Sequence, residues 1–222
     1  MTTAAGAPMV LVAAAIVAGA AVTTSYDPLS ETLSVLAGRG SGQGIMTAGF
    51  ILSAVCQIET AVGLRVLRLS ARVALAAAGC CGLAVAAFPV TVSANVHAHL
   101  AAAGAGVVAL ALLPVLGVSN VPTSPLVCRP RWAVTATVVL CVLVAWVYYE
   151  ANHGVVLGLA ERLTAVAELG WPVVVVVFAR RADRAIARAP AERVSQRVPE
   201  ESENDVRRTR LALREKLAIP AA

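Results

Sequence analysis

Six apolar runs, each close to the twenty residues needed to cross about 30 Å of hydrocarbon, constrain what this chain can fold into. They lie at Ala4–Val22, Ile45–Leu64, Val73–Val92, Leu100–Val118, Trp132–Tyr149 and Gly158–Ala179. Hydrophobic residues make up 59% of the chain and charged residues 14%, whereas soluble domains are nearer one half and one quarter. Such a chain has too little polar surface to cover a globule in water. We therefore predict an all-α fold, a polytopic membrane protein with a six-transmembrane-helix bundle.

Arginine placement predicts the orientation of this bundle. Basic clusters follow the second, fourth and sixth runs, at residues 65–72, 129–131 and 180–188, and the alternate connections hold only Arg39. Lys and Arg gather in cytoplasmic loops, so we predict a plasma-membrane protein with cytoplasmic N- and C-termini. No Lys or Arg precedes the first run, as it would in a secretory signal, and we expect this run to be retained as a span.

The end of the chain has a different composition from the rest. From Arg180 onward it carries eleven of the eighteen basic residues and seven of the thirteen acidic ones. We predict a six-helix transmembrane domain over residues 1–180 and a charged cytoplasmic tail over 181–222, partly disordered with a short helix at Asp205–Leu217. The tail mixes both charges and has no aromatic residue, which argues against nucleic-acid binding.

Polar side chains gather on the predicted outer side, where three loops and the start of the sixth span meet. The loops supply Tyr26, Asp27, Ser30, Glu31, Ser34, Ser93, Asn95, His97, His99, Glu150, Asn152 and His153, and the span begins with Glu161 and Arg162. Histidines and carboxylates together can bind zinc or transfer protons. The spacing matches no HExxH motif, so a metal or hydrolytic site is the least favoured interpretation and we expect no cofactor. The other two interpretations of the cluster are a binding site for a lipid or solute, and structural hydrogen bonds between the loops. We expect Arg162 to pair with Asp27 or Glu31.

Two carboxylates lie within the apolar runs themselves. Glu59 is near the inner end of the second run and Glu168 near the middle of the sixth. An ionised carboxylate in hydrocarbon is costly, so each should face the bundle interior, be hydrogen-bonded or stay protonated. Gln57, two residues from Glu59, should face the other way. Such residues either carry protons or solutes or join helices.

Three separated motifs give the chain a resemblance to a known family. These are Tyr26-Asp27-Pro28 followed by Thr32 to Ala37, then His99 opening an Ala/Gly-rich span that reaches Pro114, then Gly158 to Arg162 followed by Trp171. Over roughly residues 8–181 the chain resembles a bacterial and archaeal membrane family, domain of unknown function 998 (DUF998), in which isoleucine is commoner at the position of Leu33. The resemblance implies a six-helix bundle and singles out Tyr26, Ser34, His99, Glu161 and Arg162. It implies no activity, and His97 and His153 match none of its motifs.

These observations favour a binding role over an enzymatic one, and they leave open whether the protein is an enzyme. We predict a multi-pass protein of the bacterial plasma membrane that binds a lipid or small solute at its outer face, or serves as a subunit of an envelope complex. Its partners would be the bilayer, that ligand and a further membrane protein. The predicted ligand site comprises Tyr26, Asp27, Glu31, Ser34, His99, Glu161 and Arg162. One alternative is a membrane-face hydrolase or transferase using His99 with Glu161 or Asp27. The other is a proton-coupled carrier using Glu59 and Glu168, although no inverted repeat is evident.

Overall fold

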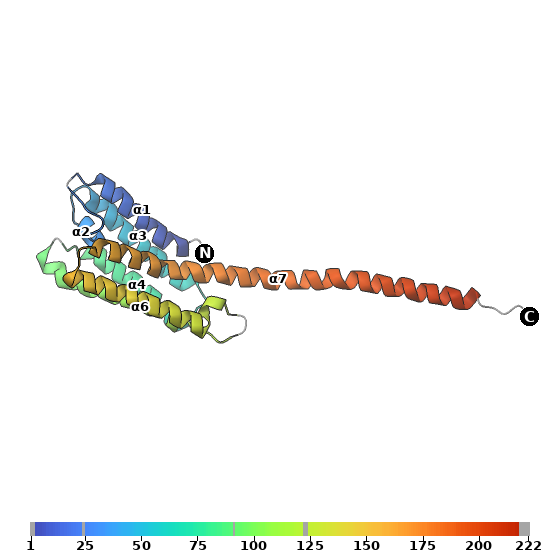
Figure 1. The fold of residues 1–222 in the computed structure, drawn as a ribbon. Coiled ribbons are helices and arrows are strands. Elements are labelled where there is room, and N and C mark those ends of the chain that lie inside the picture. The colour runs from blue at the N-terminus through green and yellow to red at the C-terminus, as the bar shows by residue number, and fades with distance from the viewer. Residues whose placement is uncertain (1–2, 24, 91, 122–123, 218–222) are drawn as a thin grey trace, which may run out of the picture. The chain divides into compact units, whose positions relative to one another are not determined.

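The computed structural model describes residues 3–23, 25–90, 92–121 and 124–217, all in helices and their connections. Its helices are α1 (Thr3–Ala21), α2 (Leu33–Leu36), α3 (Gly42–Gly63), α4 (Leu69–Ala87), α5 (Val96–Leu116), α6 (Pro130–His153) and α7 (Leu157–Leu217), with 3-10 turns η1 (Ser93–Asn95) and η2 (Leu126–Cys128). The chain divides into two units, Met1–Ala179 and Arg180–Ala222. In the first, the long helices lie side by side, with the short α2 at one end of them (Figure 1).

Six helices in the described part of the chain are long and apolar enough to cross a membrane. They correspond one to one to the six predicted runs, so the predicted all-α bundle of six spans is confirmed. Consecutive spans pack against each other in chain order, α1 on α3, α3 on α4, α4 on α5 and α5 on α6. The connections that precede α3, α5 and α7 therefore lie at one end of the bundle, and the other connections lie at the opposite end.

Several span boundaries differ from the predicted ones because polar residues continue the helices. The fourth span begins at Val96, so that His97 and His99 lie in its first turn and not in a loop. The fifth continues to His153 and takes in Glu150. The third begins at Leu69, because Arg72 reaches back from its first turn to the carbonyl oxygens that end α3. Such a cation satisfies carbonyl groups that have no partner within their own helix.

Small residues bring neighbouring helices close together. A Cβ atom added at Gly79 on α4 would lie 2.9 Å from the carbonyl oxygen of Ala54 on α3, and one at Gly49 on α3 would overlap the Cβ of Ala14 on α1. Both crossings therefore depend on the absence of a side chain. Close approach at small residues is how helices pack when the surrounding lipid is as apolar as their side chains.

Burial in the first unit is inverted relative to a water-soluble protein. Large aliphatic residues face outward, such as Ile16 (67% exposed) and Val142 (62%), whereas His99, Thr164 and Glu168 are each no more than 3% exposed. This distribution suits a hydrocarbon surrounding, in which polar groups must find partners inside the protein.

The second unit is helical as far as Leu217, and this helical region includes the predicted short helix. The domain boundary at residue 180 and the partial disorder of the tail stay predictions.

Candidate functional site

Residues Ser25–Ser41, between α1 and α3, fold over one end of the bundle, and we call them the cap segment. Its first half is a turn built by Asp27, whose carboxylate accepts hydrogen bonds from the amide of Leu29 (3.0 Å) and the hydroxyl of Ser30 (2.7 Å). The hydrogen bond from Ser30 holds the pKa of the Asp27 carboxyl below its usual value. Aspartate favours turns for this reason, since its side chain substitutes for backbone acceptors.

The second half of the cap segment is the short helix α2. Thr32 caps it, with its hydroxyl oxygen accepting from the amide of Val35 at 3.1 Å, as threonine commonly does at a helix N-terminus. Leu33 and Leu36 are 3% and 0% exposed, so this turn is packed into the bundle end. The helix α2 is therefore packed into the core, whereas the turn at Asp27–Ser30 that precedes it is exposed.

Arg162, near the start of α7, anchors the cap segment. Its Nη1 donates to the carbonyl oxygens of Pro28 (2.7 Å) and Glu31 (2.9 Å), and its Nη2 donates to the hydroxyl of Tyr26. A third bond from Nη1 reaches the carbonyl of Gly158 in its own helix at 2.7 Å. Burial raises the pKa of the Tyr26 phenol above its usual value, and the adjacent guanidinium partly opposes this.

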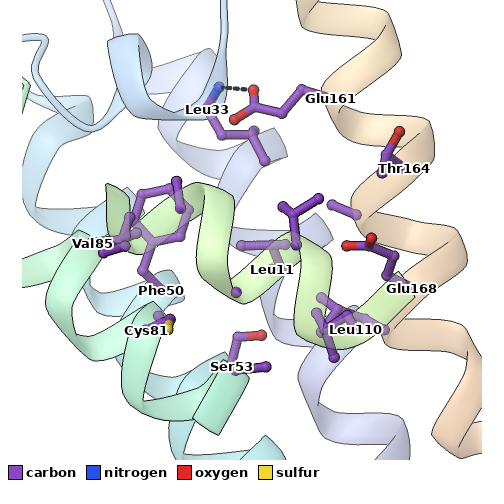
Figure 2. A pocket seen from close by; sticks show the side chains of 18 of the residues that line it. Leu11, Leu33, Phe50, Ser53, Cys81, Val85, Leu110, Glu161, Thr164 and Glu168 are labelled. Atoms are coloured by element: carbon purple, nitrogen blue, oxygen red, sulfur yellow. Dashed lines mark hydrogen bonds between the residues drawn. The ribbon is translucent and has the colours of Figure 1, made fainter. Parts of the chain in front are cut away.

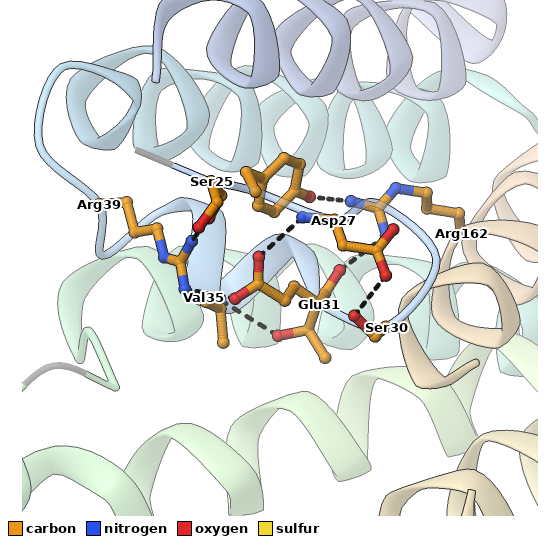
Figure 3. A network of polar contacts seen from close by, with 9 residues as sticks. Ser25, Asp27, Ser30, Glu31, Val35, Arg39 and Arg162 are labelled. Atoms are coloured by element: carbon orange, nitrogen blue, oxygen red, sulfur yellow. Dashed lines mark hydrogen bonds and ion pairs between the residues drawn. The ribbon is translucent and has the colours of Figure 1, made fainter. Parts of the chain in front are cut away.

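The prediction that Arg162 pairs with the carboxylate of Asp27 or Glu31 is wrong. Figure 3 shows the carboxylate of Asp27 bonded to Ser30, and that of Glu31 paired with Arg39 and accepting from the Asp27 amide. Arg162 binds backbone oxygens because the turn at Pro28–Glu31 presents its carbonyl groups toward α7. The guanidinium is therefore held by two backbone carbonyl oxygens of the cap segment and the Tyr26 hydroxyl, and by neither of the two acidic side chains.

His99 joins the cap segment to the start of α5. Its Nδ1 is 2.8 Å from the carbonyl oxygen of Phe88, and its Nε2 is 2.9 Å from the hydroxyl oxygen of Ser34. A carbonyl oxygen can only accept, so Nδ1 carries the ring proton; in the neutral ring, Nε2 then accepts from Ser34. The predicted partners of His99, Glu161 and Asp27, are not the ones that the ring contacts.

Glu161 binds the cap segment from α7. Its Oε2 accepts from the amide of Leu33 at 2.6 Å. Of the predicted site residues, Tyr26, Ser34, His99, Glu161 and Arg162 thus meet around the cap segment, while Asp27 and Glu31 stabilise it from within. Whether these residues bind a ligand stays a prediction.

A cavity of about 170 Å³ lies directly beneath the cap segment. Aliphatic and aromatic side chains form most of its wall, among them Leu11, Phe50, Val107 and Leu110 (Figure 2). Its polar lining consists of Ser34, Ser53, Gln57, Glu161, Thr164 and Glu168. Figure 2 shows the carboxyl group of Glu168 pointing from α7 into this space. The site is therefore a mostly apolar chamber with polar groups at its cap and on its walls.

Two side-chain oxygens in this cavity lack hydrogen-bond partners. Glu168 is 1% exposed and Gln57 is 8% exposed, and the Oε1 atom of each has no partner among the described residues. Of the three alternatives expected for Glu168, burial in the bundle interior is the one that the structure shows. Sequence reasoning did not place Gln57 in the site, although Ser53, Gln57 and Thr60 follow helical spacing on an otherwise apolar span. This polar stripe on one face of the helix is the sequence signal that predicts a buried Gln57.

Other polar residues lie away from the cavity. Glu59 is exposed near the end of α3 that is remote from the cap segment, so of the three alternatives expected for it, burial in the bundle interior is excluded. His97 and His153 are exposed as well, and Glu150 accepts from Trp146 Nε1 on its own helix at 3.1 Å. No three His, Cys, Asp or Glu side chains among the residues described are grouped to hold a metal ion.

A second hollow, of about 500 Å³, lies between α1 and α7, and we call it the lateral groove. Tyr26 and Arg162 line it together with Val12 and Ile16, which are 39% and 67% exposed. The groove therefore opens on the apolar outer surface of the bundle. Leu11, Leu33 and Ala165 line both this groove and the cavity, so only a thin wall of side chains lies between them.

These features define a class of protein, a polytopic membrane protein whose six spans line a partly open cavity beneath the cap segment. The profile of the family described as "Protein of unknown function (DUF998)" matches residues 4–178. The chain belongs to this family, as the three motifs suggested. No curated protein and no solved structure matches it.

Proposed function

We propose that this protein binds a small amphipathic molecule, or part of a lipid, in the cavity beneath the cap segment. The observation that carries the proposal is that two residues lining one mostly apolar cavity, Gln57 and Glu168, each have an Oε1 atom without a hydrogen-bond partner. Buried polar atoms nearly always have hydrogen-bond partners, and leaving one without costs free energy. An occupant that donates hydrogen bonds would satisfy both.

The size and surroundings of the cavity support this role. Its volume of about 170 Å³ is close to that of the apolar cavity of about 150 Å³ that binds benzene. That is room for a compact organic molecule or one end of a lipid. The lateral groove adjoins the cavity across Leu11, Leu33 and Ala165. Movement of these side chains would admit a molecule dissolved in the bilayer.

The proposal is tested with Glu168→Leu, which replaces the carboxyl group by an alkyl group of similar size. Because it removes an unpartnered buried polar atom, this variant should be at least as stable as the wild type when empty. It should also lose the small molecule or lipid that native mass spectrometry detects on the wild-type protein extracted in mild detergent. Glu59→Leu, at the exposed carboxylate, is the matched control and should retain it. Wild-type protein with no bound molecule, or equal retention in Glu168→Leu, would contradict the proposal.

A second candidate function, acyl transfer or ester hydrolysis, is favoured by one specific geometry. The hydroxyl of Ser34 donates to a histidine whose other nitrogen is held by a carbonyl oxygen, the arrangement of a nucleophile, its base and an orienting group. Ser34 Oγ would attack the acyl carbonyl while His99 Nε2 takes its proton and passes it to the leaving group. Covalent labelling of Ser34 by a fluorophosphonate, lost in His99→Gln, would support this function. An unlabelled wild-type protein would count against it.

The remaining predicted roles have less support. A proton-coupled carrier was predicted to use Glu59 and Glu168, but Glu59 is exposed and does not line the cavity. Membership of an envelope complex, a plasma-membrane location and cytoplasmic termini all stay predictions.

A further inference from the structure

We infer that the ligand of the capped cavity is a small primary or secondary alkylammonium ion. This inference rests on the proposed function and names the chemical class that the same site would take. Three properties of the cavity carry it, namely the direction of its hydrogen bonds, its charge and the shape of its apolar wall.

The polar groups around the cavity present acceptors rather than donors. The hydroxyl of Ser53 donates to the carbonyl of Ala7 at 3.1 Å, and that of Thr164 donates to the carbonyl of Ala160 at 2.8 Å. The hydroxyl of Ser34 is likewise engaged with His99 at 2.9 Å. The hydrogens of these hydroxyls thus point away from the cavity.

The two unpartnered atoms, Gln57 Oε1 and Glu168 Oε1, are acceptors as well. Apart from the amide nitrogen of Gln57, the polar side chains described in the lining therefore offer an occupant oxygen lone pairs. A group that only donates fits such a lining. An ammonium group carries N–H donors and no acceptor, whereas a quaternary ammonium has no N–H at all.

Apart from one thiol, the ionisable side chains described in the lining are both acidic, as this pattern requires. The carboxyl groups of Glu161 and Glu168 line the cavity, and no Lys, Arg or His side chain does so among the described residues. Arg162, the cation next along α7, lies in the lateral groove and donates to Pro28, Glu31 and Tyr26. An unpaired carboxylate at this depth is costly, and a bound cation offsets the cost.

The wall of the cavity selects an alkyl substituent over a bare ion. A metal cation of the hard kind takes roughly six or more oxygen ligands, but aliphatic and aromatic residues such as Leu11, Phe50 and Leu110 form most of this surface. A dry cavity of about 150 Å³ accepts benzene, so one of about 170 Å³ fits an amine with on the order of four to six carbons.

Two neighbouring cysteines allow a direct test. Cys81 lines the cavity, whereas Cys80 is exposed on the outer surface of α4, and both thiols are free. The other three cysteines are replaced by alanine, and the full-length protein is placed in nanodiscs. Each thiol is then titrated with the cationic reagent 2-aminoethyl methanethiosulfonate and with the neutral ethyl methanethiosulfonate. The cationic reagent is itself a small alkylammonium ion.

For each thiol we take the ratio of its reaction rate with the cationic reagent to that with the neutral reagent. This ratio should be about tenfold higher at Cys81 than at Cys80, because one hydrogen bond to a charged group strengthens binding by about that factor. Glu168→Gln should bring the ratio at Cys81 down to that at Cys80. Glu59→Gln is the matched control and should leave it unchanged. As a second measurement on the unmutated site, n-butylamine should slow modification of Cys81, and neither tetramethylammonium nor 1-butanol should do so.

The outcomes separate this inference from the proposed function. If the neutral reagent modifies Cys81 without any preference for the cation, or if 1-butanol protects as well as n-butylamine, the cavity binds small molecules but the ammonium inference is wrong. A preference that survives Glu168→Gln also overturns the inference. If neither reagent reaches Cys81 while both modify Cys80, the cavity is closed to small molecules and both proposals fail.

Discussion

Replacement of Arg162 by glutamine should release the cap segment from the bundle end. The guanidinium makes three bonds to this segment, to the carbonyl oxygens of Pro28 and Glu31 and to the hydroxyl of Tyr26. Glutamine is shorter and uncharged, so it cannot reach all three acceptors. The Leu33 amide is held separately by Glu161, and this bond must also break when the segment opens, in the wild type and in the variant alike.

The size of the effect follows from the number and kind of these bonds. A hydrogen bond from a charged group contributes about 1.5–3 kcal/mol. Nη1 divides its hydrogens among three carbonyls and Arg162 is only half-buried, so the sum is well below three full bonds. We expect the opening free energy of the cap segment to fall by about 3 kcal/mol, a factor of on the order of a hundred in its open population.

Amide hydrogen exchange of peptides covering residues 29–36 measures this opening directly. The expected rise in exchange rate is about a hundredfold in Arg162→Gln, since exchange follows the population of the open state. Arg39→Gln is the control. Arg39 forms an ion pair with Glu31, with side chains 32% and 24% exposed, which contributes at most about 1 kcal/mol, and its other bond, to the carbonyl of Ser25 at 2.7 Å, lies outside residues 29–36. Unchanged exchange in Arg162→Gln, or an equal effect of Arg39→Gln, would refute the assignment of Arg162 as the anchor.

Two further predictions concern the cap segment and the helix packing. Because the pKa of Tyr26 is raised in the folded protein, its stabilising contribution is complete below pH 10.0, the usual pKa, and is lost as the pH rises through the folded-state pKa. The melting temperature of Tyr26→Phe should not show this alkaline loss of stability. Identical pH profiles of the melting temperature in the variant and the wild type would contradict the prediction. Gly79→Ala places a Cβ atom 2.6 Å from Ile58 Cγ1 and should cost about 1–3 kcal/mol by overpacking. Gly63→Ala, where a Cβ meets nothing within 4 Å, is its control, and equal melting temperatures of the two variants would disprove the close crossing.

The spans were predictable because about twenty apolar residues in a row have few alternatives to a membrane helix. The ends of the spans were less predictable, because hydropathy cannot distinguish a polar helical turn from a loop. His99 shows this, since it lies in the first turn of α5 while its ring is 3% exposed. The resemblance placed Ser34 and His99 in one site, and the structure brings them into hydrogen-bond contact.

The contacts of the site were harder to predict than its members. Arg162 binds backbone oxygens, and a carbonyl group leaves no mark in a sequence, whereas acidic side chains nearby suggest ion pairs. Gln57 and Glu168 meet at one cavity only because α3 and α7 pack around it, which no local pattern encodes. Helical spacing did separate Gln57 from Glu59, since two residues along a helix face opposite ways; the buried amide and the exposed carboxylate agree with it.

The tie between the cap segment and α7 also has a consequence for how the protein is made. The bonds that hold the segment to α7 join residues 128 to 136 positions apart in the chain. At about 5–20 residues per second, the ribosome needs on the order of ten seconds after emergence of the cap segment before its partners exist. During that interval the backbone groups later held by Glu161 and Arg162 must be solvated by water or shielded by insertion factors. The cap segment can therefore complete its folding only after the last span has been made. A chain truncated before Leu157 should be recognised as unfinished by membrane quality control.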